Sequence, residues 1–232
     1  MKKQIGCILC LCTVLMSGCS KEQSYQNLLN ERIADALAVP LTSTDTCIKY
    51  YYSYQLPRSV GSLQADDLSV LLDYEGTRFI MNLDTSGILQ DLYYQQDDQT
   101  DADPLASLTP VLKDDGICAN AASGEYTYAI RIYQVDSMYL TRVTVGHMIF
   151  TAISDLSAAI NVSNAMLRIG RSVSIKESHV IDDFANRSDT VYRAEKTALF
   201  ENLAPVNGSV ADLLKKGGQT NADAQASVAP SE

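Results

Sequence analysis

The sequence predicts an α+β fold, in which an antiparallel sheet of short strands packs against about four helices. Three observations support this class. Runs of β-branched and aromatic residues, separated by turn residues, fill 46–95 and 124–146. Apolar residues recur at helical spacing in 24–38 and 148–168. The 232-residue chain is 46% hydrophobic and 20% charged, which is typical of a folded protein with room for one large domain.

The first half of the chain is expected to contain one helix followed by several strands. The helix over 24–38 has Ser24 as its cap, and Pro40 blocks its extension. The runs expected to form strands are 46–54, 68–74, 77–83 and 87–94. Glu75-Gly76 predicts a hairpin turn between the second and third of these runs. Residues 95–116 are polar and acidic and are expected to form a loop.

The second half is expected to begin with a hairpin over 124–146 that turns at Asp136-Ser137. A central helix is predicted over 148–168, with Gly170 ending it. The later elements expected are a short strand at 172–176, helices at 189–203 and 209–216, and a disordered tail at 217–232.

Charge and composition exclude several function classes. Lys and Arg total 18 against 28 Asp and Glu, which gives a formal charge of -10. Because a chain with this charge repels the phosphate backbone of a nucleic acid, no nucleic-acid partner is expected. With two histidines, no multi-histidine metal site is expected, and no motif indicates a cofactor. The acidic stretch 97–103 lacks the glycine and glutamate of an EF-hand loop, so a solvated loop is favoured over a calcium site.

The N-terminus carries the strongest signal in the sequence. Lys2 and Lys3 precede an apolar run over 5–16. This run has the length of the apolar region of a signal peptide, and it is too short for a permanent transmembrane helix. Leu15-Met16-Ser17-Gly18-Cys19 follows directly.

This segment resembles the lipobox of bacterial lipoproteins, in which an apolar residue and two small residues precede a cysteine. Met16 stands where the family usually has an aliphatic residue such as leucine. The resemblance implies cleavage by a signal peptidase of type II after Gly18 and a thioether-linked diacylglyceryl group on Cys19. It also implies an extracytoplasmic address at the cell membrane, with the lipid bilayer as partner. Ser20 is not the aspartate that commonly retains lipoproteins at an inner membrane.

The expected organisation follows from these assignments. A signal peptide (1–18) precedes the lipidated cysteine with a short tether (19–23), a single α+β domain (24–216) and the tail. Outside the signal segment and Cys19, the remaining cysteines are Cys47 and Cys118. They form either a disulfide, which an extracytoplasmic location permits, or two separate buried thiols.

Tyrosines suggest a binding surface. Tyr50, Tyr52 and Tyr54 are expected on one face of a single strand, and Tyr126 and Tyr128 on one face of another. If these faces are exposed to solvent, they can bind a peptide or a glycan, because tyrosine offers contact area at low entropic cost. The alternative is that the rings fill half-buried positions in the sheet.

Two function classes remain. The favoured one is a membrane-anchored lipoprotein with a non-catalytic binding or assembly role at the outer face of the cell membrane, where its partner is an envelope protein or glycan. The alternative is an anchored hydrolase that acts on cell-envelope polymers. That alternative requires a cleft that gathers carboxylates such as Asp182 and Asp183, or His179.

Overall fold

The computed structural model describes residues 20–41, 46–93, 105, 108–122 and 124–184. The helices in these ranges are α2 (Ser20–Ala38), α3 (Thr85–Tyr93), α4 (Leu156–Arg171) and α5 (Glu177–Phe184). The strands are β1 (Thr46–Ile48), β2 (Tyr52–Gln55), β3 (Val60–Ala65), β4 (Ser69–Tyr74), β5 (Thr77–Leu83), β6 (Leu112–Ala119), β7 (Glu125–Val135), β8 (Met138–Val145), β9 (Met148–Ser154) and β10 (Ser174–Ile175). All the strand pairs among them are antiparallel, which confirms the predicted α+β class.

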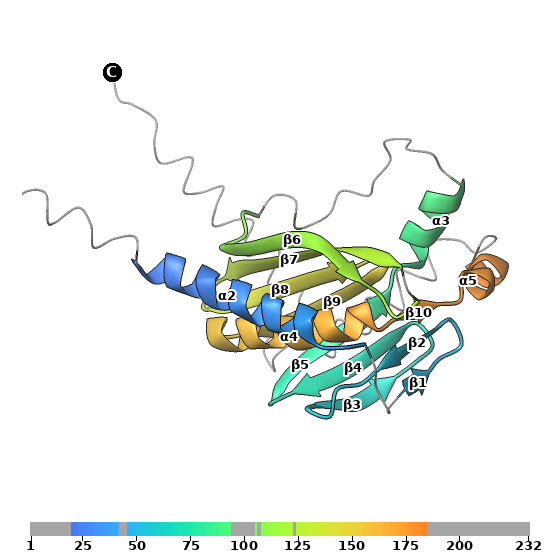
Figure 1. The fold of residues 1–232 in the computed structure, drawn as a ribbon, viewed down its shortest axis with the longest axis horizontal. Coiled ribbons are helices and arrows are strands. Elements are labelled where there is room, and N and C mark those ends of the chain that lie inside the picture. The colour runs from blue at the N-terminus through green and yellow to red at the C-terminus, as the bar shows by residue number, and fades with distance from the viewer. Residues whose placement is uncertain (1–19, 42–45, 94–104, 106–107, 123, 185–232) are drawn as a thin grey trace, which may run out of the picture.

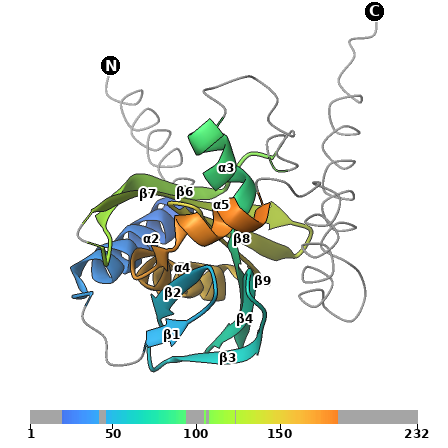
Figure 2. The same cartoon turned by 90° about the vertical axis from the view of Figure 1, so that its right-hand side faces the viewer.

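The strands form one large and one small sheet. The large sheet has the order β3-β4-β5-β9-β8-β7-β6, so two meanders join where β5 pairs with β9. The small sheet has the order β1-β2-β10. Helices α2 and α4 lie side by side across one face of the large sheet (Figure 1). Figure 2 shows that the large sheet curves around α4, and that β1 and β2 lie beside this helix on the concave side.

Both predicted hairpins are confirmed. In the first, β4 pairs with β5, and Glu75 and Gly76 have φ values of 51° and 83°. Two consecutive residues with positive φ give the turn that matches the twist of a two-residue hairpin. In the second, β7 pairs with β8 around Asp136, which has a φ of 55°.

The core lies between the large sheet and α4. Alternate side chains of the central strands point toward the helix, and several of them are fully buried: Phe79, Met81, Leu83, Ile130, Ile132, Val143, Val145, Met148, Phe150 and Ala152. Ile160, Met166 and Leu167 of α4 complete this layer at 0% exposure. Burying a large aliphatic or aromatic side chain contributes about 1.5–3 kcal/mol, so this layer is the main source of stability.

The prediction of a single strand over 46–54 is wrong. Residues 49–51 reverse the chain, and the Lys49 amide donates to the Tyr52 carbonyl at 2.8 Å. The tyrosine-rich run therefore forms a hairpin of two short strands, β1 and β2, and its tyrosines do not share one continuous face.

The prediction of a helix over the whole of 148–168 is also wrong. Residues 148–154 form β9, which pairs with β5 on one side and β8 on the other. Asp155 then caps α4 by accepting a hydrogen bond from the Ala158 amide at 2.9 Å. Gly170 does not end the helix, which continues to Arg171.

Three smaller expectations are corrected. Residues 87–94, expected as a strand, lie in helix α3 except for the last, which is outside the described residues. Residues 112–116, expected in a loop, begin strand β6, and helix α5 was not expected. The expected helices at 189–203 and 209–216, the tail and the acidic stretch 97–103 lie outside the described residues.

Candidate functional site

Helix α2 directly follows Cys19 in the sequence and is already helical at Ser20. Residues 20–23, expected as a tether, therefore belong to the helix, and Ser24 is not its cap. Leu29, Ile33 and Ala36 repeat at helical spacing on its inner side, with exposures of 0%, 3% and 0%. The helix next to the candidate lipidation site is thus part of the folded core.

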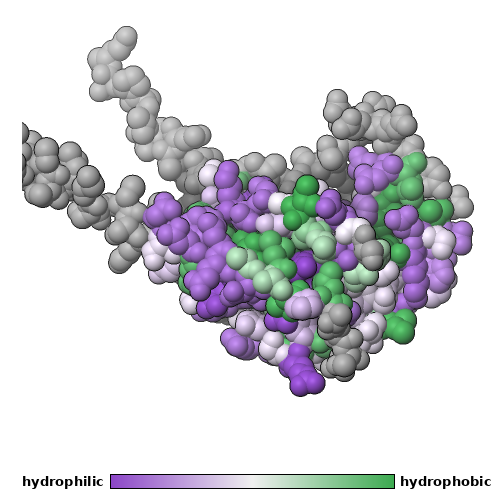
Figure 3. All heavy atoms as spheres, in the orientation of Figure 1, coloured by the Kyte–Doolittle hydropathy of each residue, from purple (hydrophilic) through white to green (hydrophobic). Residues whose placement is uncertain are grey.

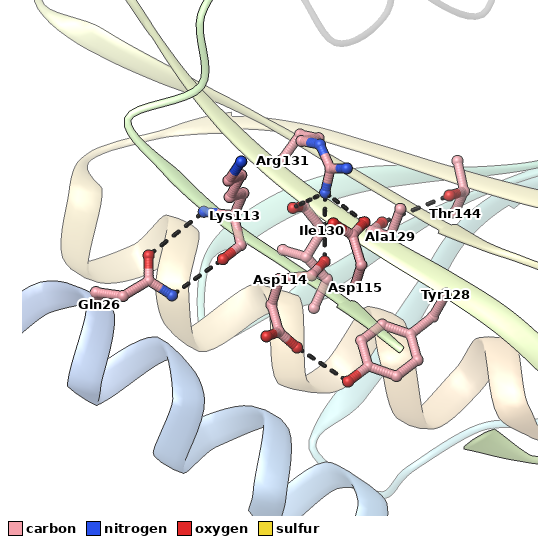
Figure 4. Close-up of polar contacts among 9 residues, drawn as sticks. All are labelled: Gln26, Lys113, Asp114, Asp115, Tyr128, Ala129, Ile130, Arg131 and Thr144. Carbon is pink, nitrogen blue, oxygen red and sulfur yellow. Dashed lines mark hydrogen bonds and ion pairs between the residues drawn. The ribbon is translucent and has the colours of Figure 1, made fainter. Parts of the chain in front are cut away.

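The first polar contact of α2 is with the edge strand β6 (Figure 4). The Gln26 side-chain amide donates to the Lys113 carbonyl at 3.0 Å and accepts from the Lys113 amide at 3.5 Å. The backbone amide and carbonyl of Lys113, on the edge of the sheet that faces away from β7, thereby both have a hydrogen-bond partner in the Gln26 side chain. A neighbouring strand would make the same two hydrogen bonds. Gln26 holds the N-terminal half of α2 against β6, the edge strand of the large sheet.

The second set of contacts joins the middle of α2 to α4. The Arg32 Nε donates to the Asn161 side-chain oxygen at 3.1 Å. The Asn164 side-chain amide donates to the Arg32 carbonyl at 2.6 Å. These polar contacts border the packed faces of the two helices and set how they are aligned along their length.

The third contact closes the C-terminal end of α2. Arg171 is 5% exposed, and its guanidinium donates to the carbonyls of Ala36, Leu37 and Val39 at 2.5, 3.0 and 3.5 Å. It also donates to the Ala119 carbonyl of β6 at 3.3 Å. A cation is favourable at a helix C-terminus, where several carbonyls have no partner within the helix. Arg171 therefore ties α2, α4 and β6 together.

Strand β6 carries acidic side chains on both faces (Figure 4). On the inner face, the Tyr128 hydroxyl donates to Asp114 at 2.9 Å. Burial, followed by the bond to Asp114, raises the pKa of Tyr128 to about 12. On the outer face, Asp115 forms an ion pair with Arg131 at 2.7 Å. These contacts stabilise the strand to which Gln26 binds.

The predicted open tyrosine surface is wrong for most of its members. Tyr52, Tyr54 and Tyr128 are 0%, 2% and 7% exposed. Tyr126 is half-buried and donates to the Val173 carbonyl at 3.4 Å. Desolvation raises the pKa of Tyr52 and of Tyr54, and the Cys47 thiol beside Tyr54 adds to the latter effect. Three of the rings are buried in the core, which is deeper than the half-buried positions of the alternative interpretation, and only Tyr126 fits that alternative. Of the five, only Tyr50 is an exposed side chain.

Replacing Tyr52 by phenylalanine is expected to raise the free energy of unfolding by about 1 kcal/mol. Within the described part of the chain its hydroxyl is buried without a hydrogen-bond partner, a state that costs roughly 1–3 kcal/mol. Urea denaturation followed by circular dichroism measures the change. Tyr54→Phe is the matched control, because it removes a hydroxyl that has a Cys47 partner. A loss of stability in Tyr52→Phe contradicts this account of the hydroxyl.

Tyr50 contacts His179, and we call these two residues, together with Ile48 two positions earlier in the same hairpin, the tip. Ile48 and Tyr50 are 75% and 49% exposed. The His179 ring lies on the Tyr50 ring at a centroid distance of 4.7 Å, and its Nδ1 is 3.0 Å from the Tyr50 carbonyl. Sequence analysis missed the tip because His179 lies on α5, a helix that the sequence patterns did not reveal.

Two of the three residues considered for catalysis, His179 and Asp183, have structural contacts. His179 packs on Tyr50, and Asp183 accepts a hydrogen bond from the Tyr51 hydroxyl at 2.9 Å. Asp182 is exposed, and His147 lies 3.6 Å from Asp91. Among the described residues, no three His, Cys, Asp or Glu side chains are grouped so that they could hold a metal ion.

Cys47 and Cys118 are separate thiols in this structure rather than a disulfide. Cys47 lies on β1 opposite Tyr54, and Cys118 is buried on β6. The Cys118 sulfur donates to the Tyr126 carbonyl at 3.5 Å, and burial raises the pKa of this thiol. Of the two alternatives considered for these cysteines, the structure has separate thiols, of which Cys118 is buried and Cys47 is half-buried.

Comparisons with known proteins do not assign the chain to a family. No family model matches the sequence, and no curated protein matches it. None of the described helices is both long and apolar enough to cross a membrane.

Proposed function

We propose that this protein is a bacterial lipoprotein, held at the outer face of the cell membrane by acyl chains on Cys19, with a non-catalytic binding or assembly role. The observation that carries the proposal is the lipobox Leu15-Met16-Ser17-Gly18-Cys19 behind a short apolar segment. The start of α2 at the next residue supports it, because the folded body begins where the anchor ends.

The energetics of acyl chains fit a permanent anchor. Each buried methylene contributes about 0.8 kcal/mol, so one chain gives marginal binding and two hold a protein stably. A diacylglyceryl group on Cys19 supplies two chains. Without residues 1–18, which contain Lys2 and Lys3, 16 basic residues remain against 28 acidic ones, and this acidic excess favours a body that stays clear of an anionic surface rather than adhering to it.

The contacts of the polar side chains support the non-catalytic part of the proposal. In the described part of the chain, Asp183 and His179 are engaged with neighbouring tyrosines, and Arg171 holds the end of α2. These contacts position backbone and rings. The proposed partners are the lipid bilayer, which the acyl chains enter, and an envelope protein or glycan, which the binding or assembly role requires.

Replacing Cys19 by alanine is expected to abolish stable membrane attachment, because the only acyl acceptor of the lipobox is lost. The variant should appear in soluble fractions or persist as an unprocessed precursor. Fractionation of cells that express the full chain, followed by immunoblotting, measures this outcome. Cys12→Ala is the matched control within the same apolar segment and should be processed normally. Membrane retention and processing of Cys19→Ala identical to those of the parent protein would falsify the proposal.

A further inference from the structure

We infer that the anchor holds the body end-on, so that the first turns of α2 face the bilayer and the tip points away from it. This inference rests on the proposed lipidation of Cys19. It assigns an orientation to the molecule and identifies which surface is next to the lipid headgroups. Three observations carry it: the absence of a spacer before α2, the contacts that fix α2 to the body, and the chemistry of its solvent-facing side.

The coupling between the anchor and the body is short and stiff. Because α2 is already helical at Ser20, bonds within Cys19 and its lipid are the remaining joint. Gln26 of α2 binds Lys113 of β6, while Asn164 and Arg171 of α4 bind the middle and the C-terminal end of α2. A helix that is held from Gln26 to its C-terminal end moves with the domain, so the direction of α2 at the membrane sets the direction of the body.

The tip lies at the far end of the molecule from Cys19. A helix of 19 residues spans about 28 Å at 1.5 Å per residue. Beyond its C-terminal end, the Gln55 side chain of β2 donates to the Leu41 carbonyl, and β2 then leads back to Tyr50. Figure 1 shows α2 beginning at one end of the molecule, with α5, which carries His179, at the other. The tip is therefore about 30 Å from the anchor when α2 stands away from the bilayer.

The solvent-facing side of α2 does not suit a helix that lies on a membrane. Such helices expose an apolar stripe to the acyl chains and basic residues to the headgroups. The exposed side of α2 instead carries mostly amides, a hydroxyl and acids, which are Gln23, Ser24, Asn27, Asn30, Glu31 and Asp35, beside Tyr25 and the small Ala34 and Ala38. Its apolar stripe is already packed in the core. Figure 3 shows hydrophilic side chains where α2 begins, whereas hydrophobic patches lie in the middle of the face in view and at its opposite end.

The chain provides a direct test because it contains no tryptophan. Tyr25→Trp places a fluorophore on the second turn of α2, where the native side chain is 40% exposed. Tyr50→Trp places one at the tip, where it is 49% exposed. Each full-length variant is purified in acylated form, as checked by mass, and reconstituted in phosphatidylcholine nanodiscs with nitroxide-labelled headgroups. The same substitutions in the Cys19→Ala background give the unanchored controls.

We expect the headgroup nitroxide to quench the Tyr25→Trp variant several-fold more strongly than the Tyr50→Trp variant, and to quench neither control. Equal quenching in both acylated variants overturns the orientation, because the body then lies along the surface. Absence of quenching in both acylated variants also overturns it, because α2 is then not next to the bilayer. Each of these results leaves lipidation intact, whereas a protein without acyl mass overturns the proposed function as well. If Tyr50→Trp disturbs folding, Ile48→Trp replaces it at a position that is 75% exposed.

Discussion

Replacing Arg171 by leucine is expected to lower the free energy of unfolding by about 3 kcal/mol, because a buried charge-assisted hydrogen bond contributes roughly 1.5–3 kcal/mol and this side chain makes several. The variant leaves the carbonyls of Ala36 and Leu37 without their donor at the end of α2, and it also removes the donor to Ala119. Urea denaturation followed by circular dichroism measures the loss.

Arg168→Leu is the matched control for this prediction. Arg168 lies in the same last turn of α4 and carries the same charge, but its side chain is more exposed than that of Arg171. We expect its replacement to change stability by less than about 1 kcal/mol, because surface substitutions usually change it by about 0.5 kcal/mol or less and Arg168 is half-buried. If the two variants lose equal stability, Arg171 does not hold α2 in the way described here.

Replacing Gly170 by alanine is expected to lower the free energy of unfolding by about 2 kcal/mol. In an open helix the same change stabilises by roughly 0.5–1 kcal/mol, since alanine loses less conformational entropy on folding. Here a Cβ atom at residue 170 would lie 2.6 Å from Val145 Cγ2 and 3.1 Å from Phe150 Cε2. Both neighbours are fully buried, so the helix must shift, and overpacking of this kind costs about 1–3 kcal/mol.

Thermal and urea denaturation of Gly170→Ala measure the net change in the free energy of unfolding, in which the cost of overpacking opposes the entropic gain from alanine. Gly61→Ala is its control, because a Cβ there meets nothing within 4 Å and the backbone needs no positive φ. The control should change stability little. A gain in stability for Gly170→Ala would show that α4 packs more loosely on β8 and β9 than the structure indicates.

The sequence predicted those parts of the fold that are determined by local chemistry. Glu75-Gly76 and Asp136-Ser137 are turn residues between β-forming runs, and both hairpins form around them. The boundary between β9 and α4 was missed because Ile149, Ile153 and Leu156 follow helical spacing by coincidence. The residues that point into the core are Met148, Phe150 and Ala152, which alternate as a strand requires. Asp155, a good helix cap, was the available signal for the true boundary.

The contacts that hold α2 depend on tertiary structure. Gln26 and Lys113 are separated by 87 positions, and Arg171 reaches Ala36 across 135. Periodicity along the chain carries no information about such pairs. The burial of Tyr52 and Tyr54 is of the same kind, because it depends on how the small sheet packs beside α4. Sequence patterns therefore indicated Cys19 as the anchor, whereas the attachment of α2 to the body emerged from the structure.

Mass spectrometry of the N-terminal peptide, prepared from the native membrane, shows whether Cys19 is the first residue and carries the lipid. We expect a peptide that begins at Cys19 and has the mass of a diacylglyceryl group on its sulfur. A peptide that begins at Cys19 without acyl mass, or one that retains residues 1–18, would contradict it.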